Sequence, residues 1–208
     1  MGHTSTTSSV TRAWKARLQE ALAEAQGDRS AGTWTTHVGF YALATLGAAP
    51  RVRHVVHRGF VQDSTTLVTT TDVRAPKAHE IHAHPAVELA WWIAPAKLQV
   101  RRSLMQFRIA GQASIVPHAA HAWRAATSEP AWDAERARVW HALSPGLQDT
   151  FRGAPPGTPL AEAASAASPE EDASRIPTSE VDVLDLAQMK RTIYRQDASR
   201  WTATEVTP

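Results

Sequence analysis

Short strand-like runs separated by turn residues fill the stretch from residue 38 to residue 116, and this alternation limits the possible folds more than any other feature. The runs are rich in β-branched and aromatic residues, and they predict strands over residues 38–46, 51–60, 65–71, 87–93 and 104–116. Strands that follow one another through short connections favour an antiparallel barrel over a parallel sheet with crossover helices. The sequence contains no Gly-x-Gly-x-x-Gly or phosphate-loop pattern, which excludes a glycine-rich nucleotide site.

Helical patterns lie before, between and after these runs. Apolar residues at helical spacing predict an amphipathic helix over residues 11–26. Pro76 suits a first helical turn, so a short helix is predicted over residues 75–84. The remaining predicted elements are helices over 134–143 and 146–151, a strand over 181–186, and a terminal hairpin formed by 191–195 and 201–206.

These elements predict one mainly β domain over residues 10–208. We expect a six- to eight-stranded antiparallel barrel with an N-terminal helix and helices between the barrel strands. Residues 1–9 are small and polar and are predicted to be disordered. Residues 161–179 are poor in large apolar side chains and are predicted to be a flexible linker. Because the apolar pattern resumes after this linker, the last strands are expected to complete the same barrel.

Composition removes several classes of function. The 208-residue chain has no cysteine, which excludes disulfides, thiolate catalysis and cysteine-ligated metals. The same absence is typical of a reducing compartment, so we expect a cytoplasmic protein. The net charge of +2 gives no support for a nucleic-acid partner. No apolar run approaches the roughly 20 residues that span a bilayer, so we expect no membrane partner.

Cations and hydroxyls gather around the third predicted strand and its two neighbours. Arg53 lies on the preceding strand, and Lys77 lies at the start of the following helix. Thr70 and Thr71 end the third strand itself. A phosphate monoester carries nearly two negative charges, and binding it without a glycine-rich loop takes arginine, lysine and hydroxyl groups from separate elements. These four residues fit a phosphate site if their elements meet at one end of the barrel, although threonine runs are also common as good strand formers.

Three motifs in this order resemble one known family. Residues 53–60 read Arg-His-Val-Val-His-Arg-Gly-Phe, residues 71–77 read Thr-Asp-Val-Arg-Ala-Pro-Lys, and residues 106–111 read Gln-Phe-Arg-Ile-Ala-Gly. Together they resemble the pyridoxamine 5'-phosphate oxidase superfamily of FMN-binding split barrels, and in particular its poorly characterised branch. The resemblance covers roughly residues 11–206. It implies a split β-barrel, FMN as the cofactor, and a homodimer with FMN at its interface.

The resemblance also implies roles for single residues. Arg53 and Lys77 would hold the FMN phosphate, with Thr70 and Thr71 adding contacts. Gln106 would hydrogen-bond the polar edge of the flavin ring, and Arg191 would reach the flavin across the dimer interface. Gln99 is an alternative for the ring contact, and Gln106 is preferred because Gly111 follows it at the matching distance. The complete set at cofactor-binding positions is Arg53, Val55, Val56, Arg58, Thr70, Thr71, Lys77, Gln106 and Arg191.

The sequence departs from the vitamin B6 oxidases of this superfamily at their substrate site. Pro76 replaces an arginine, and the Arg-Leu-His run before their C-terminal arginine is absent before Arg191. Their tyrosine and arginine substrate clamp has no match around residues 140–145. We therefore expect FMN binding to be retained and do not predict vitamin B6 oxidation. The expected function is an FMN-dependent oxidoreductase acting on an unidentified small molecule; the alternatives are a non-catalytic flavin-binding or flavin-sequestering module and a haem-binding split barrel.

Histidines form a cluster at His79, His82 and His84, and a second pair at His118 and His121. The cluster lacks the His-Glu-x-x-His spacing that places two imidazoles and a carboxylate around zinc. We predict no metal site and interpret the cluster as the solvated side of a helix.

Overall fold

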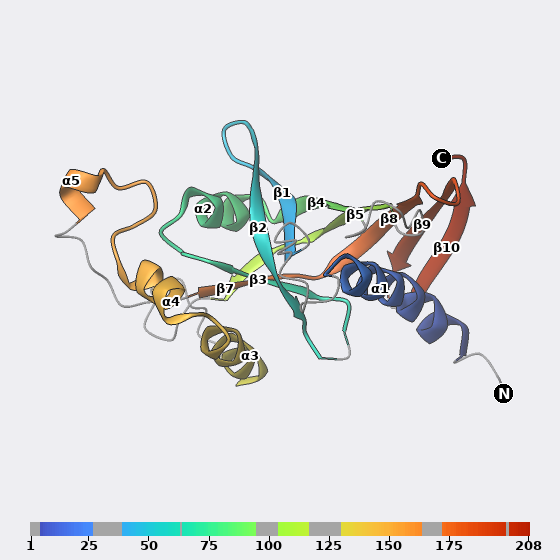
Figure 1. Cartoon of the computed structure of the whole chain (residues 1–208), viewed down its shortest axis with the longest axis horizontal. Helices are drawn as coiled ribbons and strands as arrows, with labels where there is room; N and C mark the ends of the chain where they lie inside the picture. Colours follow the sequence, from blue (N-terminus) through green and yellow to red (C-terminus); the bar gives the residue numbers. More distant parts are fainter. Residues whose placement is uncertain are drawn as a thin grey trace.

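The computed structural model describes residues 5–26, 39–62, 64–94, 104–116, 130–163, 172–198 and 200–208. Within them ten strands form one sheet in the order β10-β9-β8-β5-β4-β1-β2-β3-β7-β6 (Figure 1). Every pairing is antiparallel, and together with the number of strands this confirms the prediction of a mainly β, antiparallel fold. The strands are β1 (Phe40–Leu46), β2 (Pro50–Phe60), β3 (Leu67–Thr71), β4 (Ala86–Ile93), β5 (Met105–Gln112), β6 (Ser114–Val116), β7 (Asp172–Ile176), β8 (Thr178–Asp185), β9 (Lys190–Asp197) and β10 (Arg200–Val206).

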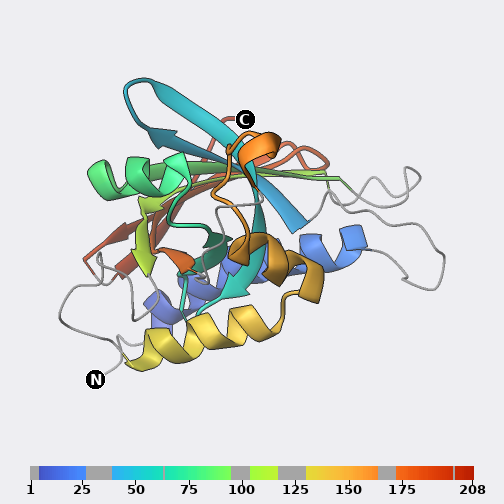
Figure 2. The ribbon, with the colours of Figure 1, turned by 90° about the vertical axis from the view of Figure 1, so that its left-hand side faces the viewer.

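The helices lie at the ends of the sheet and on one side of it (Figures 1 and 2). They are α1 (Ser5–Gln26), α2 (Pro76–Ala83), α3 (Pro130–His141), α4 (Pro145–Arg152) and α5 (Leu160–Ala163). Pro76 occupies the first turn of α2 as predicted, and the Ser144 hydroxyl accepts a hydrogen bond from the Leu147 N–H at the start of α4. No helix in the described part of the chain is long and apolar enough to cross a membrane.

Helix α1 supplies one wall of the core. Trp14, Leu18, Ala21 and Ala25 recur at helical spacing and are buried against the sheet, where α1 packs on β10 and β4. The Trp14 ring lies 5.8 Å from the ring of Trp201 and 6.0 Å from that of Phe60. The helix begins at Ser5, so the prediction of disorder over residues 1–9 is wrong from residue 5 onward. Hydroxyl residues at its start have helical backbone because the helix continues into a well-packed stripe.

The sheet has two strands more than the upper limit of the prediction. One arises because the expected strand over 104–116 divides at Ala113, whose N–H donates to the Pro85 carbonyl at 2.7 Å. The other is β7, which falls inside the predicted linker. The linker prediction over 161–179 is therefore wrong for residues 172–179, which form β7 and the start of β8.

Strand β7 illustrates why composition misled the linker prediction. It pairs with β3 on one side and β6 on the other, so its backbone groups bond to two neighbours. Arg175 adds side-chain contacts: its Nε donates to the Ser114 hydroxyl at 2.7 Å, and its guanidinium lies 4.8 Å from the Trp132 ring centroid. A polar segment thus forms a strand because partner strands on both sides fix its backbone.

Gly111 allows β5 and β8 to approach closely. The register between these strands shifts between Ala110 and Gly111, and a Cβ atom at position 111 would lie 2.2 Å from the Pro177 carbonyl oxygen. Any side chain there would force backbone apart. The glycine that ends the third motif is therefore required by packing of the sheet.

The imidazole of His57 is enclosed by aromatic rings in the core. Its ring centroid lies 4.8 Å from that of Trp91, 5.4 Å from Phe60 and 6.4 Å from Tyr41. Its Nδ1 is buried and has no hydrogen-bond partner among the described residues. Burial disfavours the charged form and lowers the pKa of His57 from 6.5 to about 4.

We expect this histidine to make the fold acid-sensitive. The unfolded chain binds a proton near pH 6.5 and the folded chain only near pH 4, so the unfolded state holds more protons in between. Lowering the pH from about 7 to 5 should therefore reduce the free energy of unfolding by about 2 kcal/mol. Urea unfolding at both pH values checks this, with His57→Phe as the non-titrating control. An equal pH dependence in the two proteins would exclude His57 as the cause.

Candidate functional site

Arg53 lies in a cluster where β1, β2 and α2 meet. Its guanidinium donates to the Thr45 hydroxyl at 2.5 Å, to the Leu43 carbonyl at 3.3 Å and to the Glu80 carboxylate at 2.6 Å. Thr45 in turn donates to Glu80 at 2.5 Å. The β1–β2 register, which pairs Arg53 with the buried Leu43, places this cluster on the core-facing side of the sheet at its end.

Lys77, in the first turn of α2, is the second cation of this cluster. Burial is the main cause that lowers its pKa, and the charge of Arg53 acts in the same direction; Asp72 and Glu80 oppose both. Among the described residues Lys77 forms no ion pair, whereas the charge of Arg53 is matched by Glu80. The structure thus brings the two predicted phosphate cations together, and of the two only Arg53 has an ion-pair partner among the described residues.

The Asp72 and Arg74 side chains of the second motif connect the loop after β3 to α4. Asp72 accepts from the Arg74 backbone N–H at 2.8 Å and from its guanidinium at 2.9 and 2.7 Å. Arg74 also donates to the carbonyls of Phe151, at 2.8 Å, and Gly153, at 3.0 Å. These two motif residues therefore have a structural explanation, which is to fix the loop that leads into Lys77.

Arg58 and the threonines of β3 form no hydrogen bond with Arg53 or Lys77 among the described residues. The Arg58 Nε donates weakly to the Thr70 hydroxyl at 3.4 Å, and burial lowers the pKa of Arg58. The Thr71 side chain is buried, and its hydroxyl lies 3.4 Å from the Asp72 carbonyl. Arg58 is not among the charges that shift Lys77. The four predicted phosphate residues are thus not united: Arg53 lies with Lys77, whereas Thr70 contacts Arg58 and the Thr71 hydroxyl contacts the Asp72 carbonyl.

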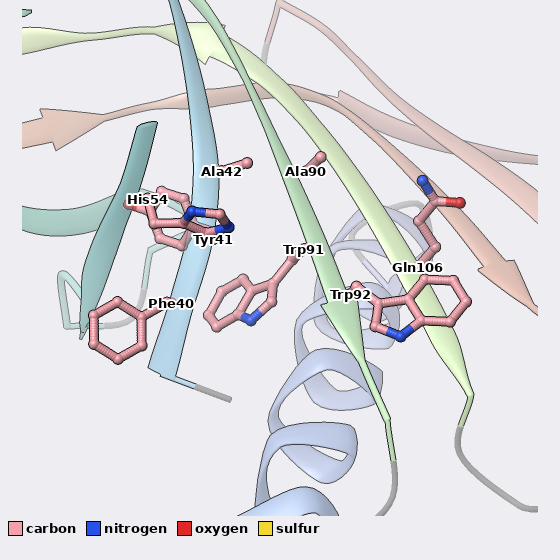
Figure 3. Close-up of a pocket in the computed structure, with 8 residues that line it drawn as sticks. All are labelled: Phe40, Tyr41, Ala42, His54, Ala90, Trp91, Trp92 and Gln106. Carbon is pink, nitrogen blue, oxygen red and sulfur yellow. The ribbon is translucent and has the colours of Figure 1, made fainter. Parts of the chain in front are cut away.

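A cavity of about 590 Å³ opens on the opposite face of β1, β4 and β5. Figure 3 shows the eight residues that line it, with Gln106 and Trp92 as neighbours on adjacent strands. Trp92 is 53% exposed and Phe40 39% exposed, which is unusual for large apolar side chains. The lining residues are Phe40, Tyr41, Ala42, His54, Ala90, Trp91, Trp92 and Gln106.

Gln106 therefore lines the cavity, whereas Gln99 lies outside the described residues. Phe40, His54 and Trp92 were not among the predicted cofactor-binding residues. A signal for Trp92 was present, because alternation along β4 sends Trp91 into the core and Trp92 outward. Phe40 and His54 carried no such signal, because only the pairing of β1 with β2 places them on this face.

The strand register extends this face from β5 to β9. Gln106 pairs with Leu184, and Leu184 pairs with Arg191, so directly paired side chains place Gln106 and Arg191 on one face two strands apart, about 10 Å. Asp182 accepts two hydrogen bonds from the Arg191 guanidinium at 3.0 and 2.8 Å, and this contact raises the pKa of Arg191. Arg108 lies between Glu88, at 2.7 Å, and Asp182, at 3.7 Å.

One chain does not unite the two halves of the predicted site. The Arg53 side chain points to the core-facing side of β2, and Gln106 lines the cavity on the other face of the sheet. Their strands, β2 and β5, are three positions apart in the sheet, which is roughly 14 Å at about 4.8 Å per strand. Val55 is buried in the core, and Val56 alternates with it onto the face of the cavity. The phosphate half of the predicted site (Arg53 and Lys77) and its ring half (Gln106 and Arg191) therefore lie on opposite faces of the sheet.

The histidine cluster shows no arrangement suited to a metal. His79, His82 and His84 are exposed on α2 and its C-terminal cap. No group of three or more histidine, aspartate or glutamate side chains in the described ranges lies close enough together to hold a metal ion. His118 and His121 fall outside those ranges.

A family model described as the pyridoxamine 5'-phosphate oxidase FMN-binding domain matches residues 11–117. The chain belongs to this family. It is 26% identical over 212 residues to the pyridoxine/pyridoxamine 5'-phosphate oxidase 2 of Arabidopsis thaliana, covering 94% of this chain and 96% of that protein. The recognised motifs are thus those of the family, and the relationship extends well beyond the matched segment.

Two solved structures share the fold of this chain. A pyridoxamine 5'-phosphate oxidase-related FMN-binding protein from Nostoc punctiforme superposes with a TM-score of 0.75 at 23% identity, covering 94% of this chain and 97% of its own. PhzG from Burkholderia lata superposes with a TM-score of 0.64 at 17% identity, covering 93% and 92%. These similarities confirm the split-barrel prediction at the level of the fold.

Proposed function

We propose that this chain binds FMN and acts as an FMN-dependent oxidoreductase on a small molecule. The observation that carries the proposal is the partly buried Lys77 beside Arg53, where β2 meets the start of α2. Desolvation disfavours this positive charge, and a bound phosphate would compensate it. Membership of the family supports FMN as the source of that phosphate.

The cavity on the other face fits the ring end of such a ligand. Its volume of about 590 Å³ lies within the range of small-molecule sites, roughly 300–1,000 Å³. Its walls are mainly apolar and aromatic, and the Gln106 amide offers both a donor and an acceptor to a polar ring edge. FMN would supply the electron transfer, and the residues of this chain would orient the ring and exclude water from it.

We infer that two copies of the chain build each site. Gln106 and Arg191 share a face that one chain cannot join to its own Arg53 and Lys77. The same face exposes Phe40, Trp92 and Val52, the last 70% exposed. Exposed apolar groups beside charged ones are typical of a surface that another protein covers. A two-fold dimer would bring the ring half of one copy to the phosphate half of the other.

The absorbance spectrum of the purified protein tests the proposal first. A flavin spectrum, or saturable binding of added FMN to the flavin-free protein, supports it, whereas haem bands would favour the haem-binding alternative. Reduction of the bound flavin by a nicotinamide nucleotide and its reoxidation in air would support the oxidoreductase. Flavin that binds but turns over with no donor would favour the non-catalytic module; the missing substrate clamp is consistent with that alternative.

Complementation between two variants tests the shared site. We expect Lys77→Ala and Arg191→Ala each to weaken FMN binding as separate homodimers. A mixed dimer carries both changes in one site and neither in the other, so about half of the sites in mixed dimers should regain wild-type affinity. Co-expression with two affinity tags isolates that species for titration. If each site were built by one chain, the mixed dimer would regain none.

A further inference from the structure

Glu80 is the one carboxylate that contacts Arg53 in the described part of the cluster. Its Oε2 atom accepts from the Arg53 guanidinium at 2.6 Å and from the Thr45 hydroxyl at 2.5 Å. Gly47, in the turn between β1 and β2, makes room for it, because a Cβ atom there would lie 3.2 Å from the Glu80 Cγ. Three elements therefore hold a carboxylate against the arginine that we assign to the FMN phosphate.

The carboxylate is ionised over the physiological range. The hydrogen bond from Thr45 lowers the pKa of Glu80 most, and Arg53 lowers it further against the opposing effect of burial. Counting one charge for each group, Arg53, Lys77 and Glu80 sum to +1, while Asp72 is paired with Arg74. Glu80 thus removes half of the positive charge that the two cations offer to a dianionic phosphate.

We propose that Glu80 is an internal anion that competes with the phosphate for Arg53 and so limits how strongly the site prefers FMN over unphosphorylated riboflavin. This inference rests on the proposed phosphate site at Arg53 and Lys77. Phosphate binding requires the guanidinium to exchange a carboxylate oxygen for a phosphate oxygen, or to hold two repelling anions. Both routes reduce affinity for FMN and leave riboflavin, which has no phosphate, unaffected.

A purely structural role is the competing explanation. The Arg53–Glu80 pair also joins α2 to β2, and loss of a partly buried ion pair lowers stability whatever its effect on ligands. The two roles differ in the readout that they change. A structural contact alters the free energy of unfolding and affects both flavins alike, whereas a competing anion alters the ratio of FMN affinity to riboflavin affinity.

The deciding experiment compares FMN and riboflavin titrations of the full-length, flavin-free wild type and Glu80→Gln. The amide keeps the shape of the side chain and removes its charge. We expect FMN to bind about three- to tenfold more tightly, riboflavin to be unchanged, and the FMN gain to shrink as salt increases. Glu205→Gln is the matched control, because it removes one carboxylate from an exposed pair with Lys190 at 3.1 Å. Equal or weaker FMN binding by a folded Glu80→Gln protein overturns the inference.

A second variant and a second ligand test the inference if the first experiment gives no result. If Glu80→Gln does not fold, Glu80→Met removes the same charge with a similar volume and should show the same FMN gain. If the wild type binds no FMN, the proposed function fails, and thermal stabilisation by inorganic phosphate then tests the inference separately. Greater stabilisation of Glu80→Gln than of the wild type by phosphate supports it, and equal stabilisation rejects it.

Discussion

Arg53→Ala is expected to weaken FMN binding about a hundredfold. Removing the guanidinium deletes charged hydrogen bonds to the phosphate, which contribute about 1.5–3 kcal/mol, and each 1.4 kcal/mol is about tenfold in affinity. It also removes the ion-pair partner of the Glu80 carboxylate, now 2.6 Å away, and leaves that negative charge beside the phosphate. Riboflavin binding should change little, because riboflavin has no phosphate.

Titration of flavin fluorescence measures both affinities. Arg152→Ala is the control, because Arg152 is an exposed arginine paired with Asp149 at 3.3 Å on α4. The double variant Arg53→Ala with Glu80→Ala should recover part of the loss, since the unpaired carboxylate is then gone. Unchanged FMN affinity in Arg53→Ala would remove this residue from the phosphate site and leave Lys77 as its only assigned cation.

Trp91→Ala is expected to reduce the free energy of unfolding by about 4 kcal/mol. The Trp91 side chain is fully buried, and its ring lies 5.1 Å from that of Tyr41 and 4.8 Å from that of His57. Truncating a large core side chain loses its transfer free energy and leaves a cavity. Urea unfolding, monitored by far-ultraviolet circular dichroism of the backbone, measures the change in the free energy of unfolding.

Trp92→Ala is the matched comparison, one residue along the same strand. Trp92 points out of the core and is 53% exposed, so its loss should change stability by less than about 1 kcal/mol in the monomer. Because it lines the cavity beside Gln106, the same variant should weaken flavin binding or dimer formation. Equal destabilisation by the two variants would contradict the assigned directions of these neighbouring side chains.

Local sequence patterns predicted the strands and helices of this chain well, because alternation and turn residues act over short distances. The expected strands at 51–60 and 87–93 differ from β2 and β4 by one residue at one end. Gln106, which the family resemblance assigned to the flavin ring, lies on the outward face of β5 and lines the cavity. Arg53 and Lys77 were expected to approach each other only if their elements meet at one end of the barrel, and the charge of Arg53 does act on Lys77 in the structure.

Long-range partners could not be read from the same patterns. The contact of Arg53 with Glu80 joins residues 27 apart, and that of Arg191 with Asp182 depends on the hairpin register. Each is a choice among several carboxylates that spacing alone does not distinguish. The cavity wall of Phe40 and His54 arises only from strand pairing, and the strand at β7 was hidden by its polar composition.

The place of β7 in the sheet determines when the chain can acquire its fold. β3 and β6 pair with β7, and β5 pairs with β8, so three of the described strands up to residue 116 lack a partner until the C-terminal strands are present. A polypeptide ending there would expose unpaired strand edges, which favour association with other chains. Pairings over about a hundred residues also close large loops late in folding. The segment that matches the family model therefore depends on later strands for its sheet partners, and β3 gains its second neighbour only after β7 has been synthesised.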